Sequence, residues 1–216
     1  MRDRVFYYLD SLIERYPLLS QCKNSILDAF NILEKCFSTG HKLLIAGNGG
    51  SCADSEHIVG ELMKGFKNRR KCSCEFANRL KSIDFTRGDE LANKIQGALP
   101  AIALDGHQSL NTAFVNDVED GGLLLFAQQV YGYGVKGDTF LAISTSGNSK
   151  NVINAAIVAK AKGMQVIGLT GCDGGELIKY TDAAIVAPQS ETYMIQELHL
   201  PIYHCLCLML EEKFFN

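Results

Sequence analysis

Residues 43–51 read Leu-Leu-Ile-Ala-Gly-Asn-Gly-Gly-Ser, and residues 52–62 continue Cys-Ala-Asp-Ser-Glu-His-Ile-Val-Gly-Glu-Leu. The apolar run that opens this stretch is typical of a buried parallel strand. The glycines after it allow a sharp turn and a close approach of the backbone to a ligand. A helical pattern follows, and its N-terminus, with free N–H groups and the positive end of the dipole, favours an anion. His57 and Glu61 lie one turn apart and share one face of this helix. The stretch therefore predicts a ligand site at the tip of a strand.

Residues 139–149 repeat this design. Thr-Phe-Leu-Ala-Ile at 139–143 predicts a strand, and Ser-Thr-Ser-Gly-Asn-Ser at 144–149 predicts a polar turn before a helix that runs to about residue 162. Four hydroxyls and the N–H groups of a helix start can form a phosphate cradle without a lysine. A turn that only caps the helix is the alternative. Since ligands bind at the carboxyl ends of parallel strands, one ligand that touches both loops is the simplest interpretation.

The rest of the chain predicts helices that alternate with strands. Two amphipathic helices are expected over residues 3–16 and 19–38, separated by Pro17. A long last helix is expected over 191–213, and Pro201 should kink it or mark a boundary. Short helices are expected over 89–96, 123–131 and before Asn116-Asp117, and further strands over 99–104, 164–170 and 183–187. With the strands at 43–46 and 139–143, this order predicts an α/β fold: a five-stranded, parallel, doubly wound sheet in three α/β/α layers, preceded by N-terminal helices.

Composition and charge exclude several classes of function. The chain has 216 residues, 47% hydrophobic and 21% charged, which predicts one globular domain. The net charge of −3 gives no bulk attraction to nucleic acid or to an anionic membrane. No apolar run approaches the roughly eighteen residues of a membrane span, and residues 1–4 lead into a mixed helix rather than a signal peptide. We therefore expect a cytoplasmic protein.

The eight cysteines show no zinc-finger spacing. Several lie in apolar segments, so reduced thiols of a cytosolic protein are the expected interpretation. Cys72-x-Cys74 lies in a polar stretch, where a metal-binding or redox pair is the alternative.

The hydrophobic pattern weakens between residues 65 and 97, where basic residues gather. Five cations occur within eight residues, and they form either a solvated loop or a rim that attracts a phosphate. These cations are Lys64, Lys67, Arg69, Arg70 and Lys71.

Nucleotide sites are disfavoured. Gly47-x-Gly49 resembles the start of a dinucleotide-binding fingerprint, but Cys52 stands where the third glycine is needed. The acidic residue expected about twenty positions later falls in the basic stretch. The chain has no G-x-x-x-x-G-K-[ST] motif, and Gly147 lacks the pattern of a hydrolase nucleophile elbow.

Six motifs in order resemble the phosphoheptose isomerase family, whose members contain a sugar-isomerase (SIS) domain. They are Gly47-Asn48-Gly49-Gly50-Ser51, His57-x-x-x-Glu61, Asn116-Asp117, the loop 144–149, Leu169-Thr170-Gly171-x-Asp173-Gly174-Gly175, and Ile195-Gln196-Glu197-x-His199 with His204. The resemblance implies an enzyme that interconverts sedoheptulose 7-phosphate and D-glycero-D-manno-heptose 7-phosphate. It also implies a homotetramer with active sites at subunit contacts. On this basis residues 1–216 form a single SIS domain, with helices 1–40 at the oligomer interface and 66–98 as an inserted segment.

The resemblance also implies the site residues. One Zn²⁺ per subunit would be held by His57, Glu61, Gln196 and His204. Substrate contacts are implied for Asn48, Gly49, Gly50, Ser51, Glu61, Asn116, Asp117, Ser144, Thr145, Ser146, Ser149 and Gln196. The family places an arginine near the site, and either Arg69 or Arg70 is the candidate here.

The chemistry of such a reaction assigns roles to these residues. Moving a proton between adjacent carbons through an enediol(ate) needs a base, an acid and a grip on the remote phosphate. Glu61 is the predicted base, His204 the predicted acid, and loop 144–149 the predicted phosphate site. Zinc would polarise the carbonyl, although a carboxylate that binds zinc is a weaker base.

The sequence permits two arrangements of the predicted metal ligands on the last helix. Gln196 and His204 are about 12 Å apart along a continuous helix, so they either meet at one ion or serve sites in different subunits. His107 and His199 are predicted to be structural or surface histidines. The alternative functions are an isomerase of another ketose phosphate and a non-catalytic SIS module that binds a sugar phosphate or a protein partner.

Overall fold

Five parallel strands form one sheet in the order β2-β1-β3-β4-β5 in the computed structural model, which describes residues 2–216. The strands are β1 (Leu43–Ala46), β2 (Ala101–Ala103), β3 (Thr139–Ile143), β4 (Gln165–Gly171) and β5 (Ala183–Ala187). In β1, Leu43 pairs with Ala101 on one side and with Thr139 on the other. Strand order therefore reverses at β1, and the loops after β1 and β3 leave the sheet side by side. The predicted doubly wound sheet is confirmed.

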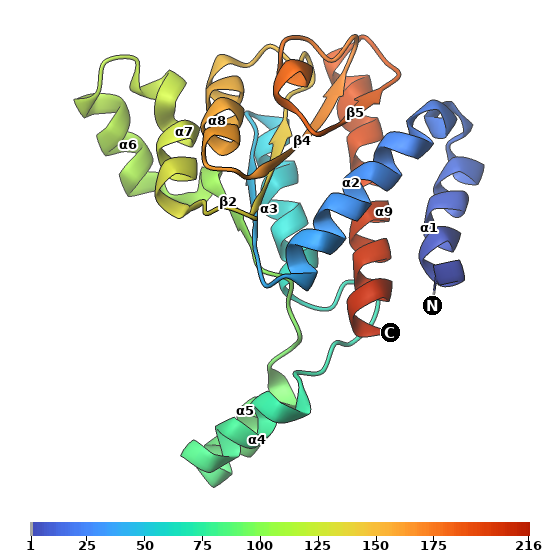
Figure 1. The fold of residues 1–216 in the computed structure, drawn as a ribbon, viewed down its shortest axis with the longest axis vertical. Helices are drawn as coiled ribbons and strands as arrows, with labels where there is room; N and C mark the ends of the chain where they lie inside the picture. The colour runs from blue at the N-terminus through green and yellow to red at the C-terminus, as the bar shows by residue number, and fades with distance from the viewer. Residues whose placement is uncertain (1) are drawn as a thin grey trace.

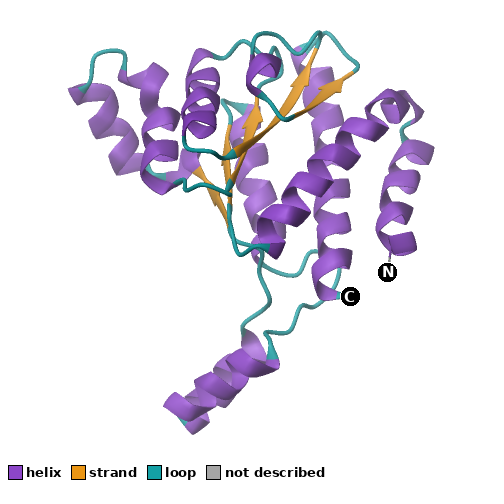
Figure 2. Ribbon diagram, viewed as in Figure 1, coloured by secondary structure: helices purple, strands orange, loops and turns teal. Residues whose placement is uncertain are grey.

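Helices cover both faces of this sheet (Figures 1 and 2). The alternation of side chains along β1 sends Leu43 and Ile45 to one face and Leu44 and Ala46 to the other. The first face packs against α1 (Arg2–Arg15), α2 (Lys23–Ser38), α3 (Gly50–Met63) and α9 (Thr192–Phe215). The second face packs against α7 (Gly121–Tyr133) and α8 (Lys150–Ala161). This packing fixes α3 and α9 on the same face, next to each other.

Strands β3 and β5 begin and end where the sequence predicts. The boundary or kink predicted at Pro201 is a different case. Helix α9 continues through Pro201, which is itself buried. A proline inside a helix costs about 3 kcal/mol through its missing N–H and its ring. The helix buries apolar side chains on both sides of this position, including Ile195 and Ile202. This burial outweighs the local cost, so the predicted boundary at Pro201 is wrong.

The segment expected to be mostly irregular is a helical hairpin, α4 (Cys74–Ile83) and α5 (Phe85–Lys94). Ser73 and Asp84 cap the two helices, because their side chains accept hydrogen bonds from the N–H groups of Phe76 and Arg87. The hairpin projects away from the sheet (Figure 1). Ile83 and Phe85 at its tip are 84% and 78% exposed. The two helices pack against each other, but only Gly88 of the hairpin is buried, so most of its apolar side chains stay exposed.

The remaining elements are one helix, α6, and three 3-10 turns. Helix α6 (Gln108–Asp117) carries Asn116 and Asp117 in its last turn, rather than after its end as predicted. The 3-10 turns are η1 (Pro17–Cys22), η2 (Leu104–Gly106) and η3 (Leu177–Tyr180). Between residues 2 and 216, no helix combines the length and the apolar character that a bilayer crossing requires.

Candidate active site

The two predicted loops are joined by a pair of amide side chains. Asn48 Nδ2 donates to Asn151 Oδ1, and Asn151 Nδ2 donates back to Asn48 Oδ1, both at 2.9 Å. Asn48 lies in residues 47–51 after β1, here named the glycine loop. Asn151 lies in the first turn of α8, directly after residues 144–149, here named the hydroxyl loop. Sequence reasoning missed Asn151, although its place behind the hydroxyl loop was the available signal. The two loops thus form one continuous surface.

Gln196 of α9 lies against the glycine loop. A Cβ atom built on Gly50 would come within 2.5 Å of Gln196 Nε2, so a larger residue at position 50 would displace the Gln196 amide. The structure therefore brings together two elements far apart in sequence that were both predicted to contact the substrate.

The hydroxyl loop is held by hydrogen bonds between its own residues and by close packing against Gly174. Ser144 Oγ donates to Ser149 Oγ at 3.0 Å, and Ser146 Oγ accepts from the N–H of Asn148 at 3.2 Å. Gly147 has φ +65°, and a Cβ there would collide with the carbonyl oxygen of Gly174. Ser149 is the N-cap residue of α8, yet within the described chain its side chain makes no capping hydrogen bond. The alternative of a turn that only caps the helix is therefore not supported.

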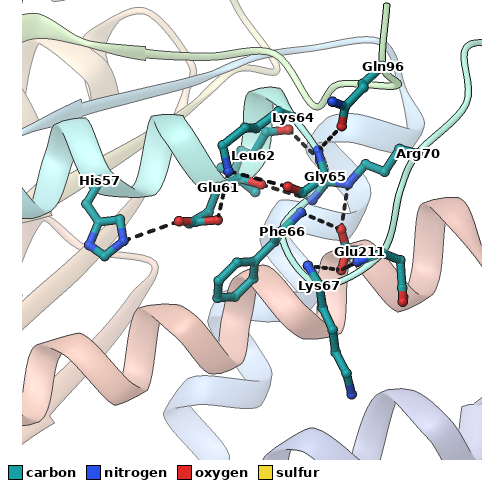
Figure 3. A network of polar contacts seen from close by, with 11 residues as sticks. His57, Glu61, Leu62, Lys64, Gly65, Phe66, Lys67, Arg70, Gln96 and Glu211 are labelled. Carbon is teal, nitrogen blue, oxygen red and sulfur yellow. Dashed lines mark hydrogen bonds and ion pairs between the residues drawn. The ribbon is translucent and has the colours of Figure 1, made fainter. Parts of the chain in front are cut away.

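His57 and Glu61, two to three turns farther along α3, form a second group with His204 of α9 (Figure 3 shows His57 and Glu61). His57 Nε2 lies 3.2 Å from Glu61 Oε1. The rings of His57 and His204 meet edge to face, with centroids 5.0 Å apart. Burial lowers the pKa of His204, so the neutral imidazole is favoured.

Two other side chains that sequence reasoning missed complete this group. Tyr203 Oη lies 2.9 Å from His57 Nδ1 and donates to Asp54 Oδ1 at 3.2 Å. Tyr203 is the residue directly before His204, but an isolated tyrosine in an apolar helix carries no sequence signal for such a role.

A buried ion pair holds the end of α3 (Figure 3). Arg70 donates to the carbonyl oxygens of Glu61 and Leu62 at 2.9 and 2.7 Å, and to Glu211 Oε1 at 2.8 Å. Glu211 also accepts from the N–H groups of Phe66, Lys67 and Asn68. Burial alone would raise the pKa of Glu211, but these N–H groups and Arg70 outweigh it, so its pKa is lowered.

Of the two arginines predicted near the substrate, only Arg70 is committed to an ion pair within the described residues, whereas Arg69 stays exposed and its role stays a prediction. Arg70 is fully buried in the ion pair, and Arg69 donates to the carbonyl oxygen of Asn93 at 3.1 Å. The phosphate-rim interpretation is wrong for Arg70, because its guanidinium is used inside the fold. Sequence alone could not separate a solvated arginine from one that neutralises a buried carboxylate.

Asn116 and Asp117 lie apart from these groups. Asn116 Nδ2 donates to Asp117 Oδ1 at 2.9 Å at the exposed end of α6. Within residues 2–216, neither side chain hydrogen-bonds to the other predicted site residues. A substrate contact by this pair stays a prediction.

The predicted metal ligands are partly assembled. Among the described residues, no three His, Cys, Asp or Glu side chains converge closely enough to hold a metal ion. Within residues 2–216, the buried His204 Nε2 has no hydrogen-bond partner, and Glu61 Oε2 accepts no hydrogen bond, although Lys64 Nζ lies 3.6 Å from it. Two imidazoles and a carboxylate are a donor set that zinc accepts, so these residues fit the ion. Gln196 lies instead beside Gly50, near the start of α3.

His199 has a structural role, as predicted. It is fully buried, and its Nε2 donates to the carbonyl oxygen of Thr170 at 3.0 Å. Burial lowers its pKa from 6.5 to about 4, against a smaller opposing effect of the hydrogen bond. His107 is half-buried near the ring of Tyr133, and its structural role stays a prediction.

The buried His199 predicts a loss of stability in acid. Between pH 6.5 and pH 4 the unfolded chain binds a proton that the folded chain excludes, so stability falls as pH decreases through this window. The two pKa values correspond to about 3 kcal/mol in total. We expect the unfolding free energy of His199→Gln, measured in urea at several pH values, to fall less than that of the wild type. Equal slopes for the two proteins would refute this assignment.

The amide pair that joins the loops predicts a binding defect. Asn151→Ala removes both hydrogen bonds to Asn48, and we expect KM to rise about tenfold with kcat little changed. The matched control is Asn154→Ala on the same helix, whose amide donates to Leu123 O instead of to the glycine loop. An equal KM increase in the control would show that the effect comes from α8 and not from the loop contact.

Comparisons with known proteins identify the relatives of this chain. A family model for the SIS domain matches residues 85–171. The phosphoheptose isomerase of Nitratiruptor sp. is 42% identical over 173 residues, 80% of this chain and 78% of that protein. The phosphoheptose isomerase of Aneurinibacillus thermoaerophilus is 38% identical over 180 residues, 83% of this chain and 77% of that protein. A solved phosphoheptose isomerase from Francisella tularensis superposes with a TM-score of 0.74 at 30% identity, over 97% of both chains.

The sequence identity to these relatives is higher than a shared fold alone produces, and it extends over most of each chain. Together with the two loops joined at the sheet edge, they establish that this chain belongs to the phosphoheptose isomerase family of SIS-domain proteins.

Proposed function

We propose that this protein is an aldose–ketose isomerase that interconverts sedoheptulose 7-phosphate and D-glycero-D-manno-heptose 7-phosphate through an enediol(ate). Family membership supports the reaction. The observation that carries the proposal is the junction of the glycine loop with the hydroxyl loop, through Asn48 and Asn151. This surface lies beside the helix that carries His57 and Glu61.

Each side chain has a defined part in the reaction. Glu61 takes the proton from C1 of the ketose and returns it to C2 of the enediol(ate). His204 moves a proton between O1 and O2, and its neutral imidazole is able both to donate and to accept. The two groups come from neighbouring helices of one sheet face, so their separation is set by the packing of α3 on α9.

The hydroxyl loop supplies the grip on the phosphate. Its Ser, Thr and backbone N–H groups, with the start of α8, suit an anion. Binding energy from this unreactive end orients the reacting carbons. Asn48, Gly49, Gly50, Ser51 and Gln196 would line the sugar between the two ends.

Zinc fits the same group of residues. His57, Glu61 and His204 would hold it, with Gln196 completing the set if its side chain moves from Gly50. When bound, zinc supplies polarisation of a carbonyl oxygen. Removal of zinc with a chelator is expected to lower activity, and re-addition to restore it.

The assembly we propose is a homotetramer of single SIS domains in the cytoplasm. The exposed Ile83 and Phe85 of the α4–α5 hairpin support an oligomer, because exposed apolar patches mark contact surfaces. Eight free cysteines support a reducing compartment. Sedimentation of the protein at about four chain masses would support the tetramer, and a monomer would contradict it.

Turnover of sedoheptulose 7-phosphate tests the proposal directly. The purified protein is incubated with the ketose, with and without added zinc, and the aldose is measured. Formation of the aldose is expected. A panel of other ketose phosphates is run in parallel, and faster turnover of one of them would reassign the substrate. No turnover of any would favour a binding module.

A further inference from the structure

We infer that Tyr203 is a positioning residue that holds the ring of His57 with its Nε2 lone pair facing Glu61. The inference deepens the proposed function and rests on it, because a lone pair at this place prepares His57 to bind a divalent cation. Tyr203 is not among the residues that the sequence predicts for the site.

A chain of hydrogen bonds connects α9 to two residues of α3. Tyr203 Oη donates to Asp54 Oδ1 at 3.2 Å and lies 2.9 Å from His57 Nδ1. The Tyr203 ring is almost completely buried and packs edge-on against His57, with centroids 5.5 Å apart. The hydroxyl group therefore has a fixed position between the carboxylate and the imidazole.

The direction of these bonds determines the tautomer of His57. A phenol has one proton, and Tyr203 gives it to the carboxylate of Asp54. The contact with His57 then needs a proton from Nδ1, because the remaining lone pair of Oη is the acceptor. A neutral imidazole that carries its hydrogen on Nδ1 has a lone pair on Nε2.

In this tautomer His57 Nε2 is an acceptor, although the neighbouring carboxylate of Glu61 would pair best with a donor. His57 Nε2 lies 3.2 Å from Glu61 Oε1, so two lone pairs face each other unless a proton or a cation lies between them. His204 Nε2, which has no hydrogen-bond partner among the described residues, lies in the same group, and so does Glu61 Oε2, which only Lys64 Nζ approaches, at 3.6 Å. Histidine ligands of metals are commonly oriented by a hydrogen bond at their other ring nitrogen, and Tyr203 supplies that bond here.

The tautomer can be measured in the metal-free protein. Nitrogen NMR of histidine-labelled protein, treated with a chelator and held at about pH 9, above the usual titration range of imidazole, is expected to show His57 protonated on Nδ1. In Tyr203→Phe the ring should change to the Nε2–H tautomer and donate to Glu61. In Asp54→Ala the same change is expected, because the freed hydroxyl can turn its proton toward His57. An Nε2–H tautomer in the wild type, or an unchanged tautomer in Tyr203→Phe, would overturn the inference.

Zinc affinity gives an independent measurement. Competition with a chromophoric chelator should show binding weakened by about 10- to 100-fold in Tyr203→Phe. The matched control is Tyr193→Phe, the same change at an exposed position of α9, where affinity should stay within about twofold. Equal affinity of Tyr203→Phe and the wild type would contradict the inference. Neither measurement uses sugar turnover, so a protein that isomerises no heptose phosphate can still pass both.

Discussion

Replacing Glu61 by Gln is expected to lower kcat by about 10³-fold or more, since the amide cannot accept the proton that the reaction moves. Gln has the same shape, and its amide N–H can donate a hydrogen bond to the lone pair of His57 Nε2, which lies 3.2 Å from the carboxylate. The substrate should therefore bind with nearly unchanged affinity. Steady-state kinetics and calorimetric titration with sedoheptulose 7-phosphate measure the two quantities separately.

A control for this variant lies on the same helix. Glu56→Gln makes the same chemical change at an exposed position of α3, where surface substitutions usually change free energies by less than about 0.5 kcal/mol. We expect its kcat to stay within about twofold of the wild type. If Glu61→Gln retained comparable activity, the base would have to be another residue.

Breaking the ion pair between Arg70 and Glu211 is expected to lower the free energy of unfolding by about 3–5 kcal/mol. Both side chains are buried, so either single replacement leaves a charge without its partner. Glu211→Gln also weakens the hydrogen bonds to three backbone N–H groups after α3. Denaturant unfolding of Arg70→Met and Glu211→Gln measures this loss.

The same ion pair should affect activity because it helps to position Glu61 and His204. Arg70 holds the carbonyl oxygen of Glu61, and Glu211 holds the N–H of Phe66, whose ring lies 5.3 Å from that of His204. A folded fraction of either variant should therefore turn over more slowly than the wild type. The control is Asp10→Asn, which breaks the exposed pair with Lys23 and should cost about 0–1 kcal/mol. A similar loss in the control and in Glu211→Gln would contradict the assignment.

The sheet could be predicted from the sequence because periodicity reports burial directly. Each strand is a run of apolar residues. The small or polar residues of the following loop mark where the strand ends. The hairpin α4–α5 could not be predicted in full, because its two short helices pack mainly on each other and bury only Gly88. Its caps, Ser73 and Asp84, were the local signals that remained.

The candidate site was predicted in its parts. The glycine loop, the His57–Glu61 spacing and the hydroxyl loop are local patterns, so they are visible in a linear sequence. Asn151, Tyr203, Arg70 and Glu211 act through partners up to 149 residues away, as the contact of Tyr203 with Asp54 illustrates. Residue type and spacing carry no information on such partners.

The sequence by itself determined the five strands, the helices that cover the sheet and the two loops at the strand tips, because short-range backbone and hydrophobic preferences decide them. Only the tertiary structure decided that Arg70 turns inward to Glu211 and that Tyr203 meets His57. The physical reason is that a buried polar group must find a partner wherever packing places one, and the packing of α3 against α9 is set by the whole sheet face beneath them.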